Sequence, residues 1–142
     1  MDDTLIGNII FSASAEGLTL VGMNQDNPKT SATFTILPSI NGKPGKVIFG
    51  SDDEFESGMN EKGLMIGLSP ASTIDVEYPA DKPTLEGSPW HTILDSCSSV
   101  ADSLEMLNEY NLVGLESCQA FITDPSGDAA IQRWGEQADQ RV

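Results

Sequence analysis

The stretch Gly58-Met-Asn-Glu-Lys-Gly-Leu64 decides how this sequence folds. It joins two β-rich runs, residues 56–60 and 64–68. Gly63 can adopt the left-handed backbone conformation that closes a tight turn, so the stretch predicts a β-hairpin in the middle of the chain. The turn needs Asn60 and Gly63 whatever the protein does, and we therefore assign both residues a structural role.

More antiparallel sheet is predicted on the N-terminal side of this hairpin. Residues 4–14 and 18–24 are β-rich runs separated by Ala15-Glu-Gly17, which predicts a second hairpin. Further strands are expected at residues 32–37 and 46–49. The acidic cluster that follows is expected to form a solvated loop; it consists of Asp52, Asp53, Glu54 and Glu56.

Helices are predicted on the C-terminal side, after a proline-rich excursion over residues 70–89. The first should run from Pro89 to Cys97, with Ser88 as its cap and Pro89 at the first helical position. The second should begin at Ser99, with Asp102 in its first turn. Its one-sided apolar stripe should pack on a sheet, and consists of Val100, Leu104, Leu107 and Leu112.

A last hairpin is predicted from strands at residues 119–123 and 129–134, joined by the turn Asp124-Pro-Ser-Gly127. The order along the chain is thus strands, helices, strands. This order predicts an α+β fold of antiparallel strands with two helices. No repeat or linker interrupts residues 1–142, so we expect a single domain.

The charge balance excludes some classes of partner. Seven Lys and Arg residues against 22 Asp and Glu residues give a net charge of -15. This charge repels phosphate backbones and anionic lipid headgroups, so we expect neither a nucleic-acid nor a membrane partner. No run reaches the length of a membrane span, and the opening residues lack the basic segment of a signal peptide. A cytoplasmic location is therefore the default expectation.

The familiar motifs of catalysis and cofactor binding do not occur. There is no Gly-x-Ser-x-Gly, no phosphate-binding loop and no His-Glu-x-x-His, so we expect neither a cofactor nor a metal. The single histidine, His91, is expected to be structural or exposed. Cys97 and Cys118 match no metal or redox spacing and are expected to be small buried hydrophobes, with a disulfide between them left open.

Three local sequences occur in order along the chain. The first is Phe11-Ser-Ala-Ser14 with Leu18-x-Leu-Val-Gly22-Met-Asn24-Gln-Asp26. The second is Val47-Ile-Phe-Gly-Ser-Asp-Asp53 with the central hairpin stretch, and the third is Asp124-x-Ser-Gly-Asp128-Ala-Ala-Ile-x-x-Trp134. Together they resemble the choloylglycine hydrolase and penicillin V acylase family of N-terminal-nucleophile hydrolases. The resemblance implies a four-layer αββα sandwich, of which residues 1–142 would form an incomplete domain, the N-terminal half.

The resemblance also implies where the site lies. Family members begin at a catalytic cysteine in Cys-Thr-x-Phe, and counting back from Phe11 puts Asn8 at that position. Asp26 takes the place of the aspartate that orients the nucleophile. Met23 replaces a substrate-binding arginine, and Ser69 stands about where an asparagine stabilises the oxyanion. Ser12 and Ser14 share the face of Asn8 in a regular strand and are interpreted as ordinary strand serines.

Asparagine has neither a thiol nor a hydroxyl, so Asn8 cannot attack an amide as cysteine does. The family acts on linear amide C–N bonds, as in penicillin V or conjugated bile salts, and a small-molecule amide is the implied substrate. We expect this chain to be inactive by itself. The alternative hypothesis is a non-catalytic binding or assembly module. Half a sandwich should also expose sheet edges and an apolar face, which predicts self-association.

Overall fold

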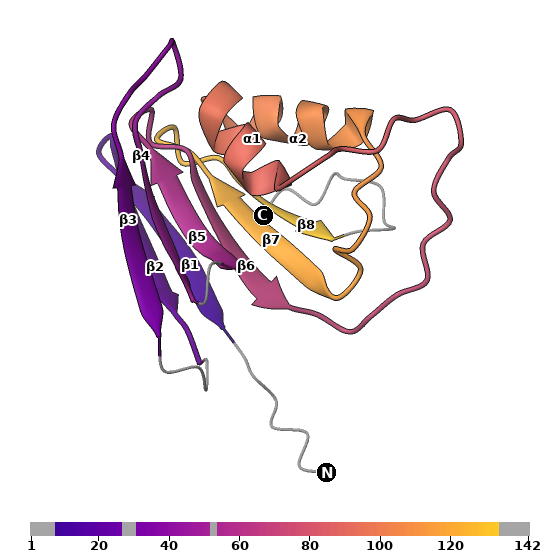
Figure 1. The fold of residues 1–142 in the computed structure, drawn as a ribbon. Helices are drawn as coiled ribbons and strands as arrows, with labels where there is room; N and C mark the ends of the chain where they lie inside the picture. The colour runs from indigo at the N-terminus through magenta and orange to yellow at the C-terminus, as the bar shows by residue number, and fades with distance from the viewer. Residues whose placement is uncertain (1–7, 27–30, 52–53, 134–142) are drawn as a thin grey trace.

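The structure is a computed structural model that describes residues 8–26, 31–51 and 54–133 (Figure 1). Along the chain, six strands precede two helices, and two more strands follow. Their bounds are β1 Ile9–Ala15, β2 Leu18–Asn24, β3 Ala32–Leu37, β4 Lys46–Ser51, β5 Glu54–Asn60, β6 Met65–Pro70, α1 Pro89–Ser96, α2 Val100–Glu109, β7 Cys118–Thr123 and β8 Ala129–Arg133. The predicted α+β class, with antiparallel strands and two helices, is confirmed.

The strands form two sheets in separate layers. Strands β3 to β8 make a six-stranded antiparallel sheet in chain order, and β1 pairs with β2 in a two-stranded sheet. Both helices lie on one face of the large sheet (Figure 1). The β1–β2 hairpin lies on the opposite face, because Ile10 and Met23 both approach Gly67 of β6.

The main core lies between the large sheet and the helices. Alternate residues of β6, β7 and β8 point to this side, since successive side chains of a strand face opposite ways. They meet the apolar stripe of α2, whose predicted packing on a sheet is confirmed. Each fully buried large side chain contributes roughly 1.5–3 kcal/mol to stability. The cluster includes Leu64, Ile66, Ile93, Leu94, Val100, Leu104, Leu107, Leu112, Ala120, Ile122 and Ala130.

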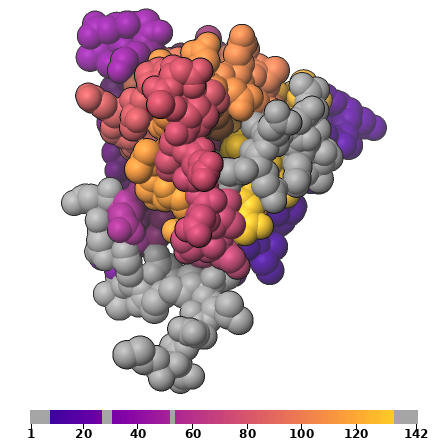
Figure 2. Space-filling model, turned by 90° about the vertical axis from the view of Figure 1, so that its right-hand side faces the viewer, coloured from indigo at the N-terminus to yellow at the C-terminus, as the bar shows by residue number. Residues whose placement is uncertain are grey.

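Most predicted boundaries agree with the structure to within two residues. Residues 71–88 form the expected excursion, which runs over the outside of the molecule (Figure 2). Of the predicted strand residues, 4–7 and Trp134 lie outside the described part. Among the described residues, no helix is long and apolar enough to cross a membrane.

The two helix caps behave differently. Ser99 accepts a hydrogen bond from Asp102 N at 3.1 Å, so the predicted cap of α2 is confirmed. Ser88 does occupy the N-cap position of α1, but its side chain makes no capping bond. Its hydroxyl is buried without a hydrogen-bond partner among the described residues. Ser88 is therefore the N-cap residue of α1 by position, as expected, but it does not supply the capping hydrogen bond.

The predicted solvated loop at residues 52–56 is wrong for its last part. Glu54 and Glu56 belong to β5, and Glu56 is half-buried and accepts a hydrogen bond from Ser51 Oγ. The register between β4 and β5 shifts at Phe49 and Gly50, and a bulge of this kind accommodates an extra residue in a strand. Asp52 and Asp53 lie outside the described residues.

Asp95 of α1 ties the helix to the β3–β4 connection. Its carboxylate accepts hydrogen bonds from Lys43 Nζ, at 2.8 Å, and from Lys46 Nζ. Burial by itself would raise the pKa of Asp95, but the two lysines outweigh it and the net pKa is lowered. The paired carboxylate therefore favours the folded state whenever it is ionised.

We expect this pair to make stability depend on acid pH. A carboxyl group whose pKa is lower in the folded than in the unfolded state stabilises the protein above the unfolded value, near 3.9, and loses this as the pH falls through the folded value. Asp95→Asn should thus be less stable than the wild type at pH 7, and the difference should shrink below about pH 4. Urea unfolding of both proteins from pH 7 to pH 3 measures it. A difference that stays constant over this range would contradict the assignment.

Candidate functional site

The candidate site lies where β1 begins, β2 ends and β6 ends. Asn8 directly precedes β1, and its side chain connects the three strands. Asn8 Nδ2 donates to Leu68 O at 2.9 Å, and Asn8 Oδ1 accepts from Asp26 N at 3.3 Å. Both polar atoms of the carboxamide are thereby engaged. The residue at the predicted nucleophile position is held in place by the strands around it.

A cavity of about 310 Å³ opens beside Asn8. Its wall combines the ends of β5, β6 and β7 with the residue that follows β2. It contains carboxamide, hydroxyl and thiol groups together with one carboxylate. The lining residues are Asn8, Gln25, Glu56, Leu68, Ser69, Pro70, Ser117 and Cys118.

The structure brings together some of the four predicted site residues. Asn8 and Ser69 line the same cavity, and both also line a smaller one of about 130 Å³. Asp26 is adjacent through its backbone N–H, and its side chain is exposed. Met23 lies apart, in a groove of about 320 Å³ between β2 and the strands β4 to β6. Gln25 lines both this groove and the Asn8 cavity.

Gln25, Glu56, Ser117 and Cys118 were not anticipated as site residues. Gln25 sits inside the first motif and could have been found from its position between Asn24 and Asp26. Glu56 belonged to the predicted loop, and Cys118 is 110 residues from Asn8 in sequence. It reaches the cavity because β7 pairs with β6, with Cys118 opposite Pro70. No local pattern indicates this pairing.

Cys118 lines the same cavity as Asn8, but its thiol is not poised to react. It is half-buried, and its Sγ donates to Leu115 O at 3.4 Å. Burial, followed by the charge of Glu116, raises the pKa of Cys118 to about 11. A thiol with this pKa is almost entirely protonated at neutral pH, and the thiolate is the nucleophilic form. Cys97 and Cys118 are both free, so no disulfide joins them, and both pack in or against the core as predicted.

His91 takes no part in this cavity. It lies on α1, where its ring meets the edge of Phe55 at a centroid distance of 5.6 Å. Burial and the nearby charge of Lys46 lower the pKa of His91. The predicted structural role is confirmed. Ser14 is likewise an ordinary strand serine, hydrogen-bonded to the hydroxyl of Thr19 at 2.9 Å.

A second, larger cavity adjoins the first on the helix side of the sheet. It measures about 460 Å³, and its wall combines the apolar side chains of Phe55, Leu85, Trp90, Leu112 and Leu115 with polar ones that include Glu54. Leu68, Ser117 and Cys118 line both cavities, so the two are neighbours. Within the part of the chain that the structure describes, no lysine or arginine lines either wall.

The motif residues away from the cavity hold the scaffold together. The side chain of Asn60 bonds to the end of α1 and closes its own hairpin turn. Asp124 accepts from Val100 N at 2.9 Å, at the start of α2, and from Ser126 N at 2.9 Å within the last hairpin turn. The structural role assigned to Asn60 is confirmed. Within the described part of the chain, no group of three His, Cys, Asp or Glu side chains could hold a metal ion.

Comparison with known proteins shows which solved structures share this fold. No protein-family model matches the sequence, and no curated protein matches it. Penicillin V acylase from Agrobacterium tumefaciens is similar in structure, with a TM-score of 0.74 and 19% identity, over 95% of this chain and 49% of that one. A variant of conjugated bile acid hydrolase from Clostridium perfringens has a TM-score of 0.67 and 21% identity, over 94% and 50% of the two chains.

A second variant of the same hydrolase gives a TM-score of 0.65 and 22% identity, over 94% of this chain and 49% of that one. The chain thus spans about half the length of each structure that it matches. The described residues have the fold of about half of penicillin V acylase and of conjugated bile acid hydrolase, which confirms at the level of fold the resemblance carried by the three sequence motifs.

Proposed function

We propose that this chain keeps the scaffold and the ligand cavity of a linear-amide C–N hydrolase, and that it binds an acyl amide without cleaving it. The observation that carries the proposal is the side chain of Asn8. It stands where the resemblance puts the nucleophile, and a carboxamide nitrogen is not a nucleophile because its lone pair is delocalised. Both of its polar atoms are also committed, to Leu68 O and to Asp26 N.

The cavities indicate how an amide would lie. Its carbonyl would face Ser69, whose hydroxyl can donate a hydrogen bond to an oxygen. The apolar acyl group would extend into the larger cavity, toward Phe55 and Trp90. Met23 lines a different groove and has no part in this arrangement.

The charges favour an uncharged ligand. Glu56 lines the cavity beside Asn8, Glu54 lines the larger cavity and Asp26 lies next to Asn8, whereas no lysine or arginine among residues 8–26, 31–51 and 54–133 lines either cavity. An anionic ligand would meet like charges there, and the chain as a whole carries -15. We therefore infer a neutral amide with an apolar, preferably aromatic, acyl group.

We expect the methyl ester of penicillin V to bind several-fold more tightly than penicillin V itself, because esterification removes the negative charge and adds only a methyl group. Isothermal titration calorimetry measures both affinities. Ser69→Trp should abolish binding by filling the cavity, and Ser72→Trp, on an exposed residue outside it, is the matched control. Equal binding of the ester by wild type and Ser69→Trp would contradict the location.

Turnover is tested separately, by the release of a primary amine from the methyl ester of penicillin V, and also from penicillin V or a glycine-conjugated bile salt. We expect none from the wild-type chain. The comparison is an Asn8→Cys variant that begins at residue 8, where the free α-amine, with an ordinary pKa near 8, can act as the local base. Amine release by the wild type, above an Asp26→Ala control, would contradict the proposal.

A further inference from the structure

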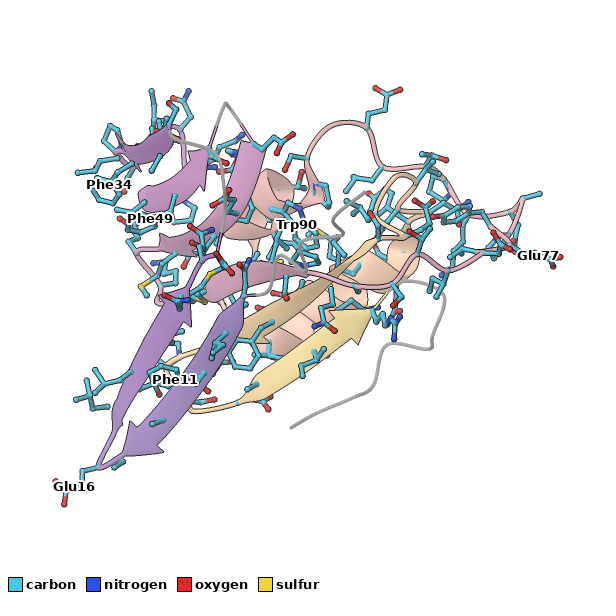
Figure 3. All side chains as sticks on the ribbon, turned by 90° about the horizontal axis from the view of Figure 1, so that it is seen from below. Phe11, Glu16, Phe34, Phe49, Glu77 and Trp90 are labelled. Atoms are coloured by element: carbon cyan, nitrogen blue, oxygen red, sulfur yellow. The ribbon has the colours of Figure 1, made fainter. Side chains whose placement is uncertain are left out.

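The β1–β2 hairpin leaves part of the large sheet uncovered. β1 lies under the β6–β8 side, where Ile10 shares a cavity with Phe121 and Ile131, and β2 borders a groove with β4 and β5. Beside and beyond this groove, β3, β4 and β5 carry large apolar side chains that remain exposed, and Phe34 and Phe49 lie next to each other there (Figure 3). We call these residues the sheet patch: Phe34 (56% exposed), Ile36 (67%), Phe49 (47%) and Met59 (39%).

The hairpin itself has an apolar outer face. Its inner residues, such as Ile10 and Met23, face the large sheet. The residues that alternate with them point away from it, and Phe11 packs across Gly22 on this outer side (Figure 3). We call these residues the hairpin patch: Ile9 (68% exposed), Phe11 (58%), Leu18 (60%) and Leu20 (60%).

The strands β1, β2 and β3, which carry most of the two patches, contain no charge. The chain has 7 Lys and Arg and 22 Asp and Glu residues, yet none of them occurs in these three strands. Among the described residues, no strand pairs with the outer edge of β2. Soluble proteins normally protect free edges with charged side chains, so an uncharged edge flanked by apolar patches is a surface suited to being buried.

We propose that these surfaces bury each other in a two-fold dimer of this chain. The two β2 edges lie side by side and parallel, related by a two-fold axis that runs along the strands. This rotation turns the partner's hairpin over, so that its outer face points at the large sheet of the first copy. The hairpin patch of each copy then packs under the sheet patch of the other, and the two contacts are equivalent.

The dimensions support a second copy as the occupant. The sheet patch lies on the strands β3, β4 and β5 at one side of the large sheet, and the hairpin that would pack on it has two strands. At roughly 100 Å² for each half-exposed large side chain, the two patches would bury about 800 Å² on each copy, which is the size of a stable interface. The contact is closed, because each copy uses both of its patches.

Charge determines how the dimer responds to salt. Each copy carries -15, and the repulsion between copies acts outside the uncharged interface. Salt screens repulsion between exposed charges, with a Debye length of about 10 Å at 0.1 M and about 3 Å at 1 M. Association should therefore strengthen as the concentration of sodium chloride is raised from about 0.05 M to about 0.5 M.

The experiment is sedimentation velocity of the full chain and two single variants. Leu20→Lys places a charge in the hairpin patch, and Phe34→Glu places one in the sheet patch. Each variant alone should be monomeric at a concentration where the wild type is dimeric. An equimolar mixture should recover a dimer, because the introduced lysine of one copy meets the introduced glutamate of the other in one contact, and the second contact is wild type. Val113→Lys, at an exposed apolar residue outside both patches, is the control and should remain dimeric.

Circular dichroism shows that each variant is folded before it is compared. A wild-type chain that remains monomeric at millimolar concentration would overturn the proposal and would assign the patches to a different polypeptide. Single variants that still dimerise would overturn it as well. A mixture that stays monomeric would also overturn the proposal. Contacts of hairpin with hairpin, or of sheet with sheet, would not bring the introduced lysine opposite the introduced glutamate, so they predict no recovery of the dimer.

Discussion

Replacing Asn60 by alanine should lower the free energy of unfolding by about 3 kcal/mol, since buried partners left unsatisfied cost roughly 1–3 kcal/mol each. Asn60 is only 3% exposed, and its Nδ2 donates to Leu94 O at 3.0 Å and to Cys97 O at 2.9 Å. These carbonyls lie at the C-terminal end of α1, where the helix itself offers no partner. Its Oδ1 accepts from Lys62 N and Leu64 N, both at 3.1 Å.

Urea unfolding, at a protein concentration low enough to keep the chain monomeric, measures this loss. Asn108→Ala on the exposed side of α2 is the matched control and should change stability by no more than about 0.5 kcal/mol. A loss below about 1 kcal/mol in Asn60→Ala would mean that water replaces the side chain at the end of α1. The conclusion that Asn60 joins the central hairpin to the helix layer would then be wrong.

Gly63→Ala should also destabilise the protein by about 3 kcal/mol, from a positive φ that costs roughly 1 kcal/mol and from overpacking that typically costs about 1–3 kcal/mol. Gly63 has a φ of 84°, and a Cβ there would lie 2.4 Å from Pro125 Cγ. Pro125 belongs to the turn between β7 and β8, so the methyl group would push two hairpin turns apart.

Two comparisons separate these costs. Gly17 and Gly42 both have a φ of 79° with no atom within 4 Å of an added Cβ, so their alanine variants should lose only about 1 kcal/mol. The double variant Gly63→Ala, Pro125→Ala should regain most of the difference, because the clashing ring atoms are gone. If Gly63→Ala loses no more stability than Gly17→Ala, the close approach of the two turns adds nothing to the cost of the substitution.

The elements of the fold were predictable because local chemistry specifies them. The turn at Glu16 and Gly17 has the positive φ values that a tight hairpin requires, and Gly63 has the same property in the central hairpin. The cap of α2 at Ser99 depends on residues only three positions apart. Ser88 shows the limit, because the same kind of residue at the same kind of position forms no capping bond, and its hydroxyl is buried without a partner among the described residues.

The site was predictable only in part. The order of the motifs pointed to Asn8 and Ser69, which line the cavity, and to Asp26, which bonds to Asn8 beside it, whereas Glu56 and Cys118 come to the cavity through the bulge in β5 and the pairing of β7 with β6. Met23 fits the motif but lines another groove, because alternate residues of β2 face the large sheet and Met23 is directed to Gly67. The position of a residue in a motif tells where it lies in the sequence, but it does not tell which cavity its side chain faces.

The sequence by itself determined the order and kind of the strands and helices, and it placed asparagine, which cannot act as a nucleophile, at the predicted catalytic position. Only the tertiary structure decided what Asn8 does instead, since its carboxamide bonds to Leu68, 60 residues away. Only the tertiary structure likewise exposed the two apolar patches, one on the outer face of the hairpin and one on the large sheet beside it. The physical reason is that turns and caps depend on neighbours in sequence, whereas cavities and surfaces depend on which strands pair and which faces are covered.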